Sequence, residues 1–294
     1  MKDQSQIPNP KSQICLTIAG LDPSGGAGII ADIKTFSAFG CFATAAVTSL
    51  TFQNTTGVFG AIHQTAESIR GQVEPIIEDF TIAATKTGML PTREVIEETW
   101  RIIEKNNLQN LVVDPVVRST SGFDLIDDAA LKVLIEMLFP LADVVTPNLP
   151  EAERITQMKI ETEQDIKKAA ETLRDFGAKN VLIKGGHLSI SDLGFGIWDL
   201  KEGLNRDDER RLKTENRIAR DFLFVGDDLR VFEAEFIETT ATHGTGCALA
   251  AAIAANLALG KNLIEAVDAA KKFVTEAIRT APNLGRGHSP INLL

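Results

Sequence analysis

The motif THGTGC at residues 242–247 holds the residue types best suited to chemistry, and an alanine-rich run at residues 248–257 follows it directly. Glycines permit a tight turn and alanines favour a helix, so several N–H groups at the start of that helix should point at one spot. Such groups bind anions, and preorganised donors stabilise the charge of a phosphoryl group in transit. Gly244, Thr245 and Gly246 therefore predict an anion cradle for phosphoryl transfer.

Cys247 closes this motif at the expected helix N-terminus, where the helix dipole favours a thiolate. The alternative is that Gly244 and Gly246 form an ordinary loop and that Cys247 is a small buried residue, as most free cysteines are. The motif alone does not decide between the two interpretations.

A second glycine-rich motif, LDPSGGAG at residues 21–28, follows the first predicted strand. With Ala31 it meets the loosest form of the dinucleotide-binding fingerprint, but its first glycine comes late and residues 47–52 contain no acid to bind a ribose. The sequence also lacks the GxxxxGKS/T motif of P-loop enzymes. We interpret residues 21–28 as a glycine-lined wall for a small flat ligand. Asp32 then either accepts a hydrogen bond from that ligand or is an exposed acid stabilised by the helix dipole.

Short apolar runs alternate with helical periodicity along the sequence, which indicates a mostly parallel sheet with helices on both faces. The predicted strands are residues 14–19, 42–50, 82–86, 111–113, 144–146, 181–184 and 195–199. The predicted helices are residues 28–39, 66–80, 92–106, 127–139, 162–176, 247–259 and 263–279. The charged segment 201–220 is expected to connect strand 195–199 to a strand at 231–236, and these two strands should pair antiparallel at the sheet edge. Residues 1–13 are expected to form a loose tail before a single domain at 14–294.

Charge and cysteine content exclude several classes of protein. The formal net charge of −10 argues against binding to nucleic acid or to an anionic membrane surface. The three cysteines, Cys15, Cys41 and Cys247, are too few and scattered for a disulfide framework or a zinc site, which fits a reducing cytoplasm. We also expect no signal peptide and no membrane-spanning segment.

Several separated motifs together resemble the hydroxymethylpyrimidine/phosphomethylpyrimidine kinases of thiamine biosynthesis, which belong to the ribokinase-like superfamily and are close to pyridoxal kinases. In order, the motifs are LTIAGLDPSGGAGIIADIKTFSAFG, LTFQNTTGV, KTGML, VVDPVV, VTPNLPEAE, LIKGGHL and THGTGCALAAAIAANLA. The resemblance covers most of residues 14–294 and thins out over about 187–238. The closing GHSP at residues 287–290 is similar to the family's terminal signature, with Ser289 where glycine is usual.

The resemblance implies a three-layer α/β/α fold, an active site at the carboxyl ends of the strands, Mg²⁺ and ATP as phosphoryl donor, and a homodimer. Cys247 falls on the family's catalytic cysteine. The residues that match those around the pyrimidine are Gly20, Ala27, Asp32, Gln53, Met89 and Val116. Those that match residues near the phosphates and metal are Asn148, Glu151, Lys184, Gly244 and Gly246.

Residue chemistry supports these assignments and leaves alternatives open. The Gln53 amide offers a donor and an acceptor to an aminopyrimidine edge, although a residue at a strand end also serves a loop. Met89 presents a polarizable thioether to a ring, or belongs to the core. Asp114 ends a buried strand, where open sheets place ligand groups. Glu151 caps a helix or, with Asp114, helps to hold Mg²⁺, partly through water.

Two departures from the family pattern affect the expected site. Thr120 stands where the family has a lysine, and Arg118 is a candidate to supply the missing cation, although arginine and lysine are not interchangeable. Ala241 stands where the family has asparagine before the cradle. Two other functions remain open at this point, namely a pyridoxal or pyridoxine kinase of the same superfamily and a catalytically weak pyrimidine-binding sensor.

Overall fold

The structure is a computed structural model that describes residues 12–118, 122, 124–185 and 218–294. These residues include a nine-stranded sheet with the strand order β3-β2-β1-β4-β5-β6-β7-β8-β9. The strands are β1 (Ile14–Leu21), β2 (Phe42–Asn54), β3 (Gly57–His63), β4 (Ile82–Thr87), β5 (Leu111–Val113), β6 (Val144–Val145), β7 (Asn180–Lys184), β8 (Ile218–Val225) and β9 (Asp228–Glu235). The inner strands from β2 to β7 run parallel, whereas β3, β8 and β9 pair antiparallel at the two edges.

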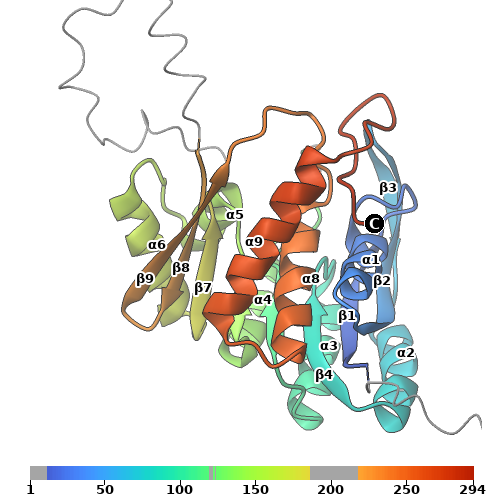
Figure 1. Cartoon of the computed structure of the whole chain (residues 1–294). Helices are drawn as coiled ribbons and strands as arrows, with labels where there is room; N and C mark the ends of the chain where they lie inside the picture. Colours follow the sequence, from blue (N-terminus) through green and yellow to red (C-terminus); the bar gives the residue numbers. More distant parts are fainter. Residues whose placement is uncertain (1–11, 119–121, 123, 186–217) are drawn as a thin grey trace, which may run out of the picture.

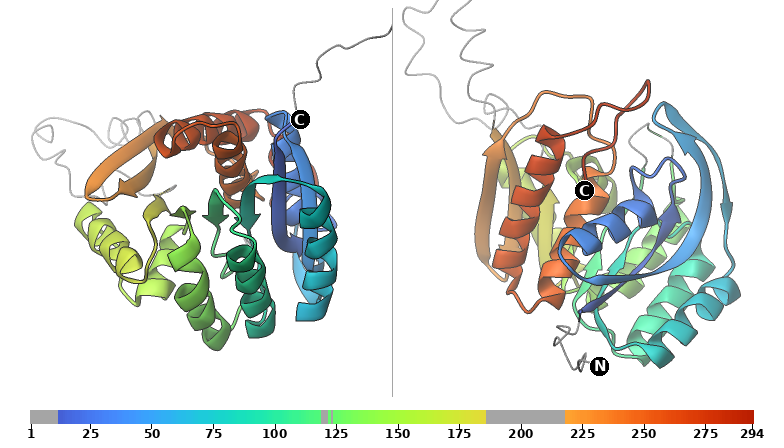
Figure 2. Two further views of the ribbon diagram at one scale, coloured as in Figure 1. Left: turned by 90° about the horizontal axis from the view of Figure 1, so that it is seen from below. Right: turned by 45° about the vertical axis from the view of Figure 1, so that its right-hand side comes forward.

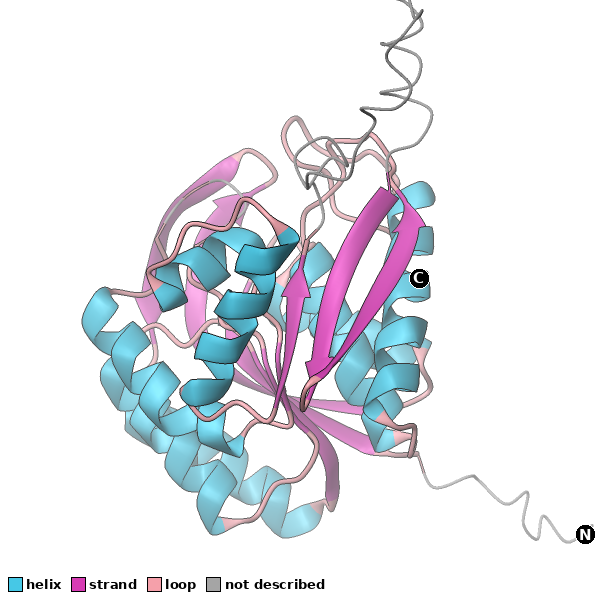
Figure 3. Cartoon of the chain, turned by 90° about the vertical axis from the view of Figure 1, so that its left-hand side faces the viewer, coloured by secondary structure: helices cyan, strands magenta, loops and turns pink. Residues whose placement is uncertain are grey.

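Helices cover both faces of the sheet, as the solidly apolar inner strands predict (Figures 2 and 3). They are α1 (Gly28–Ala38), α2 (Ala66–Asp79), α3 (Arg93–Lys105), α4 (Asp128–Leu138), a 3-10 turn (Phe139–Leu141), α5 (Leu149–Thr156), α6 (Glu163–Asp175), α8 (Thr245–Ala258) and α9 (Leu263–Arg279). One hydrophobic core lies under α2 to α6 and a second under α1, α8 and α9. Figure 1 shows α8 and α9 side by side on their face of the sheet. This arrangement confirms the predicted three-layer fold.

Local sequence explains where the helices begin. The Thr92 hydroxyl accepts the Val95 N–H at the start of α3, and Asn262 and Glu265 form a reciprocal capping box at the start of α9. No helix among the described residues is long and apolar enough to cross a membrane. Cys15 and Cys41 are buried and unpaired as disulfides.

The edges of the sheet differ from the prediction. Residues 231–236 were expected to pair with 195–199, but β9 pairs with β8, which begins at Ile218 within the segment expected to be a connection. Charged residues near its start, such as Arg220, interrupt the apolar pattern, so the sequence did not indicate this strand. In the structure, the Arg220 guanidinium pairs with the Glu233 carboxylate on β9 at 2.8 Å. Strand β3 was not predicted either. The predicted strand 195–199, residues 201–217 and the tail up to residue 11 lie outside the described residues.

The parallel strands position the functional motifs. Their carboxyl ends meet at one edge of the sheet, where ligands bind in open α/β folds. Helix α8 packs over the middle strands β1, β4 and β5. The start of α8 therefore lies beside the loops that follow these strands.

Candidate active site

The predicted cradle begins at Gly244, the N-cap of α8, whose φ of +86° favours glycine. A Cβ on Gly244 would also lie 1.8 Å from the Gly26 carbonyl oxygen, so this loop and the β1–α1 loop are in direct contact. Thr245 donates its hydroxyl hydrogen to the Thr242 carbonyl at 3.1 Å, which fixes the first turn. The Thr245 N–H donates to the Thr242 carbonyl at 3.3 Å. The N–H groups of Gly246 and Cys247 follow it in the first turn of α8, where a helix offers no earlier carbonyl, which is the geometry of an anion-binding site.

Cys247 is partly exposed in the first turn of α8. Burial raises the pKa of its thiol to about 11, although the Lys86 ammonium and a hydrogen bond from the Gly28 N–H oppose that rise. This rise runs against the expected thiolate, because the loss of hydration outweighs the favourable charges. The thiol is protonated at neutral pH.

A buried ion pair lies near this thiol. The Lys86 ammonium at the end of β4 contacts both carboxylate oxygens of Asp32, at 3.1 and 2.9 Å, and both residues are fully buried. Thr17 donates a further hydrogen bond to Asp32 at 2.6 Å. Burial alone would lower the pKa of Lys86, but Asp32 raises it above its ordinary value, so the ammonium stays charged. The alternative that Asp32 is an exposed helix acid is wrong, because β4 brings this lysine beneath α1.

Two acids and a lysine meet in front of the cradle. Asp114, directly after β5, accepts hydrogen bonds through Oδ1 from Lys184 at 2.9 Å and from the Thr146 hydroxyl at 3.2 Å. The Lys184 Nζ also lies 3.8 Å from Glu151 Oε2. A Cβ on Gly246 would be 3.2 Å from the Lys184 Nζ and 3.9 Å from Asp114 Oδ2. The lysine and the second oxygen of Asp114 therefore reach the cradle.

Glu151 has a structural role as well. It forms a capping box with Asn148 at the start of α5, with the Asn148 N–H donating to Glu151 Oε2 at 2.7 Å and the Glu151 N–H donating to Asn148 Oδ1 at 2.8 Å. The capping alternative is thus confirmed. Burial raises the pKa of the Glu151 carboxyl to about 7, against the attraction of Lys184. For Lys184, burial would lower the pKa, but Asp114 and Glu151 hold it above its ordinary value.

This set of oxygen ligands fits Mg²⁺. Magnesium takes one or two protein carboxylates and otherwise keeps waters and substrate phosphates. Asp114 and Glu151 are both almost fully buried beside the cradle, at 2% and 5% exposure. No larger cluster of metal-binding side chains occurs in the part of the chain that the structure describes.

The wall predicted for a flat ligand lies next to the cradle. A Cβ on Gly20 would be 3.0 Å from the Met89 sulfur, so the end of β1 and the loop after β4 pack closely together. Met89 is 7% exposed and its carbonyl accepts the Thr48 hydroxyl hydrogen at 2.6 Å. Val116, after β5, is partly buried, and its N–H donates to the Asp114 carbonyl at 2.8 Å. Gly20, Met89 and Val116 thus come from the ends of the adjacent strands β1, β4 and β5.

Sequence patterns did not identify Asp22 and His243. Asp22 directly follows β1 and is 2% exposed, and its Oδ2 lies 2.7 Å from the Nε2 of His243, the residue before Gly244. Gln53, half-buried near the end of β2, also donates a hydrogen bond to Asp22. Burial would raise the pKa of Asp22, but hydrogen bonds from His243, Ser24 and Gln53 hold it well below its ordinary value. Both residues stand inside recognisable motifs, but only the fold shows that they meet.

The terminal GHSP segment at residues 287–290 packs against the residue that precedes the cradle. The Ser289 carbonyl accepts the His243 N–H at 3.2 Å, and the His288 N–H donates to the Thr55 carbonyl at 2.8 Å. A Cβ on Gly287 would be only 2.0 Å from that Thr55 oxygen. Ser289, the unusual residue of this motif, is 4% exposed and its hydroxyl accepts the Leu284 N–H at 2.8 Å.

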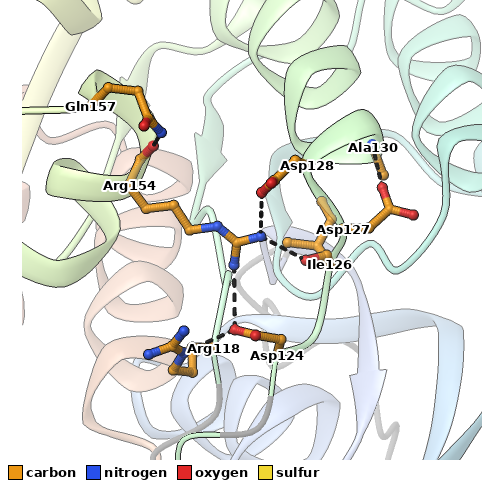
Figure 4. A network of polar contacts seen from close by, with 8 residues as sticks. All are labelled: Arg118, Asp124, Ile126, Asp127, Asp128, Ala130, Arg154 and Gln157. Carbon is orange, nitrogen blue, oxygen red and sulfur yellow. Dashed lines mark hydrogen bonds and ion pairs between the residues drawn. The ribbon is translucent and has the colours of Figure 1, made fainter.

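Arg118, the candidate replacement for the family lysine, is engaged in a network of its own (Figure 4). Its guanidinium donates to Asp124 at 2.9 Å. Arg154 of α5 joins the same network through Asp124 at 3.5 Å and Asp128 at 2.8 Å. Arg118 is therefore paired with Asp124, although both side chains are 59% exposed. Thr120 lies outside the described residues.

The chain is similar to several known proteins over most of its length. The family profile described as phosphomethylpyrimidine kinase matches residues 22–292. The hydroxymethylpyrimidine/phosphomethylpyrimidine kinase of Staphylococcus aureus strain MSSA476 is 39% identical over 283 residues, covering 96% of this chain and 94% of that protein. The crystal structure of the phosphomethylpyrimidine kinase from Clostridium difficile 630 aligns with a TM-score of 0.73 and 38% identity, covering 91% of this chain and 100% of that chain. The Bacillus subtilis pyridoxal kinase in an ADP complex aligns with a TM-score of 0.79 and 34% identity, covering 96% and 97% of the two chains.

Proposed function

The chain belongs to the phosphomethylpyrimidine kinase family and is an ATP-dependent phosphotransferase, and we propose from its site how it acts on its substrate. It phosphorylates the hydroxymethyl group of 4-amino-5-hydroxymethyl-2-methylpyrimidine and then the resulting monophosphate, which yields the pyrimidine diphosphate used in thiamine biosynthesis. One observation carries this proposal. The Gly244 cradle, Lys184 and the acids Asp114 and Glu151 converge beside a wall that ends in Gln53.

The cradle and Lys184 hold the phosphates. In the reaction the hydroxyl oxygen bonds to the γ-phosphorus of ATP, the bond from that phosphorus to the β,γ-bridging oxygen breaks, ADP leaves and the hydroxyl proton is released. Charge on the γ-phosphoryl oxygens is met by the first-turn N–H groups of α8 and by the Lys184 ammonium, 3.2 Å from a Cβ position on Gly246. Asn148 lies beside Lys184 in a parallel bridge and supports the nucleotide side of the site.

Asp114 and Glu151 are the residues that would hold Mg²⁺. When bound there, Mg²⁺ would supply positive charge against the donor phosphates. Lys184, in contact with both acids, brings a positive charge that offsets their mutual repulsion and opposes the rise in the pKa of Glu151.

Cys247 orients the acceptor hydroxyl. Because burial raises its pKa to about 11, the thiol is protonated at neutral pH and is not available as a general base. A thiol next to the cradle can still fix the direction of the attacking hydroxyl, and positioning dominates catalysis when the transition state is loose. The site therefore favours orientation over deprotonation.

Gln53 recognises the pyrimidine ring by hydrogen bonding. The aminopyrimidine presents an exocyclic N–H donor beside a ring nitrogen acceptor, and a carboxamide can pair with both. The rest of the wall around the ring consists of Gly20, Ala27, Met89 and Val116. Asp32 stabilises this wall through its ion pair with Lys86. A pyridoxine kinase is the alternative, because the pyridoxal kinase of Bacillus subtilis shares the fold at a TM-score of 0.79.

The protein is proposed to act as a homodimer through the edge hairpin of β2 and β3. Leu50 and Ile62 are paired across this hairpin, and they and Phe52, on the same face, are 39%, 54% and 50% exposed. Apolar side chains gathered in this way are typical of protein interfaces. Sedimentation of the wild-type protein should give the mass of a dimer, and Phe52→Lys should give the monomer.

A coupled assay of ADP release on a panel of hydroxymethyl heterocycles tests the proposed activity. The aminopyrimidine alcohol should give the highest kcat/KM, with pyridoxine slower. A higher kcat/KM for pyridoxine would replace the proposed substrate. Tight binding of the pyrimidine without ADP release would identify a sensor instead.

A further inference from the structure

The loop that bears the acceptor wall and the loop that bears the cradle are joined through one carboxylate. Asp22 Oδ1 accepts the Ser24 N–H at 2.8 Å and the Ser24 hydroxyl at 2.7 Å. Asp22 Oδ2 accepts the Ala27 N–H at 2.9 Å and lies 2.7 Å from His243 Nε2. Asp22 Oδ2 thus contacts both Ala27 of the acceptor wall and His243, the residue before Gly244.

The contact joins parts of the chain that are 221 residues apart in sequence. A Cβ on Gly26 would lie 2.4 Å from the Cδ2 carbon of the His243 ring, so the ring rests directly on the backbone of the wall loop. His243 is only 12% exposed and Asp22 2% in this pair. The bond is therefore charge-assisted and shielded from water, which makes it stronger than a neutral surface bond.

The chemistry of this position requires a carboxylate. Both oxygens of Asp22 accept hydrogen bonds, and an asparagine offers an acceptor at only one of the two positions. Its amide nitrogen would face two donors, which would push the loops apart. Since Asp22 stays ionised, His243 must donate through Nε2.

We propose that Asp22 and His243 are a positioning pair that sets the distance between the acceptor hydroxyl and the transferring phosphoryl group. The inference rests on the proposed kinase function, because it assigns Ala27 to the acceptor side and Gly244 to the phosphoryl side. Neither residue of the pair acts on the reacting atoms. Each ligand binds to its own loop, so breaking the pair leaves single-ligand binding intact and disturbs only their mutual placement.

The expected effect follows from the cost of misplacement. Reactive atoms held about 1 Å from their best position lose about a hundredfold in rate. His243→Phe keeps the ring against Gly26 and removes the donor, so it should lower kcat by about ten- to a hundredfold. His243→Gln keeps an N–H donor near the Nε2 position and should retain at least about a third of kcat. Asp22→Asn should lower kcat to a similar extent, but it also removes the partner of Gln53 and so tests the pair less cleanly than His243→Phe.

Two further readouts separate positioning from a general loss of structure. The dissociation constants of ATP alone and of the pyrimidine alone should change by less than about threefold in His243→Phe. The ratio of ADP released to pyrimidine phosphorylated should rise, because water competes for a phosphoryl group whose acceptor is displaced. Asp143→Asn is the matched control. Asp143 accepts the Leu111 N–H at 2.9 Å and pairs with Lys179 at 3.0 Å, at the amino ends of the strands and away from the site.

A wild-type rate in His243→Phe would overturn the inference, as would an equal loss in His243→Gln and His243→Phe. A loss of kcat with weakened binding of both ligands and an unchanged product ratio would show a structural role only. The wild-type assay is independent of these outcomes. If the wild-type enzyme does not phosphorylate the aminopyrimidine alcohol, the proposed function fails. The positioning role of Asp22 and His243 is judged separately, from the kcat of each variant relative to that of the wild-type enzyme.

Discussion

The protonation of Cys247 can be changed through the buried pair beneath it. Asp32 raises the pKa of the Cys247 thiol, while the Lys86 ammonium lowers it. Replacing Asp32 with asparagine removes the anion, while Asp114 still favours the charged form of Lys86, so the pKa of Cys247 should fall. A single charge close to a thiol shifts its pKa by about one unit or more, and one unit corresponds to about 1.4 kcal/mol.

The starting value sets the size of the signal. With a pKa of about 11, about one Cys247 in three thousand is a thiolate at about pH 7.5, against about one in ten for an ordinary thiol. Alkylation of the wild-type thiol by iodoacetamide should therefore be about three hundredfold slower than alkylation of a free cysteine. It should accelerate about tenfold per pH unit up to about pH 10, and Asp32→Asn should be about tenfold faster than wild type at about pH 7.5.

Peptide mapping by mass spectrometry measures this rate at Cys247. A Cys247→Ser variant reports the background labelling of Cys15 and Cys41, which are buried. Thermal unfolding of Asp32→Asn establishes that the variant is folded, since it leaves the buried Lys86 without its partner. Alkylation of the wild-type thiol at the rate of a free cysteine would refute the role of burial. An unchanged rate in a folded Asp32→Asn would refute the coupling of this pair to the thiol.

Three further predictions address the cradle, the phosphate site and the ring site. Gly244→Ala should abolish activity, because its φ of +86° and its approach to Gly26 leave no room for a side chain, and retention of kcat would show that the cradle rearranges. Lys184→Ala should weaken ATP at least tenfold, on the order of 1.4 kcal/mol, with a much smaller effect on the pyrimidine in calorimetric titrations, whereas equal losses would indicate a structural role. Gln53→Ala should lower kcat/KM for the aminopyrimidine by about ten- to a hundredfold and hardly affect pyridoxine, and an equal effect on both would show that Gln53 supports the loop.

The cradle and the strand-end acids could be predicted because their signals are local. Gly244 and the alanines after it specify a turn and a helix by their own conformational preferences, and α8 begins at Thr245, two residues before the predicted start at Cys247. Asp114 follows a short apolar strand, and the carboxyl end of β5 lies at the site.

The pairs that connect distant segments could not be predicted in this way. Lys86 meets Asp32 only because β1 and β4 are neighbours in the sheet, and His243 meets Asp22 only because the start of α8 packs on the loop after β1. Strand β8 was missed for a different reason. Strand β8 carries Arg220 and Asp221 among apolar residues, and both charges have partners that the sequence does not reveal, Glu233 on β9 and Lys271 on α9.

The pH dependence of kcat tests most directly whether this kinase works by placing its acceptor rather than by deprotonating it. The measurement is phosphorylation of the aminopyrimidine alcohol, followed by ADP release and by mass spectrometry of the product, in wild type and in Cys247→Ser. It runs from about pH 8 to 10, above the pKa of about 7 of the Glu151 carboxyl. With a thiol pKa of about 11, an orienting role predicts a wild-type kcat that changes by less than about threefold over this range, and a serine variant that keeps a substantial part of the rate. A wild-type kcat that rises about tenfold per pH unit, together with loss of that rise in Cys247→Ser, would show that the thiolate is the base and would contradict the account.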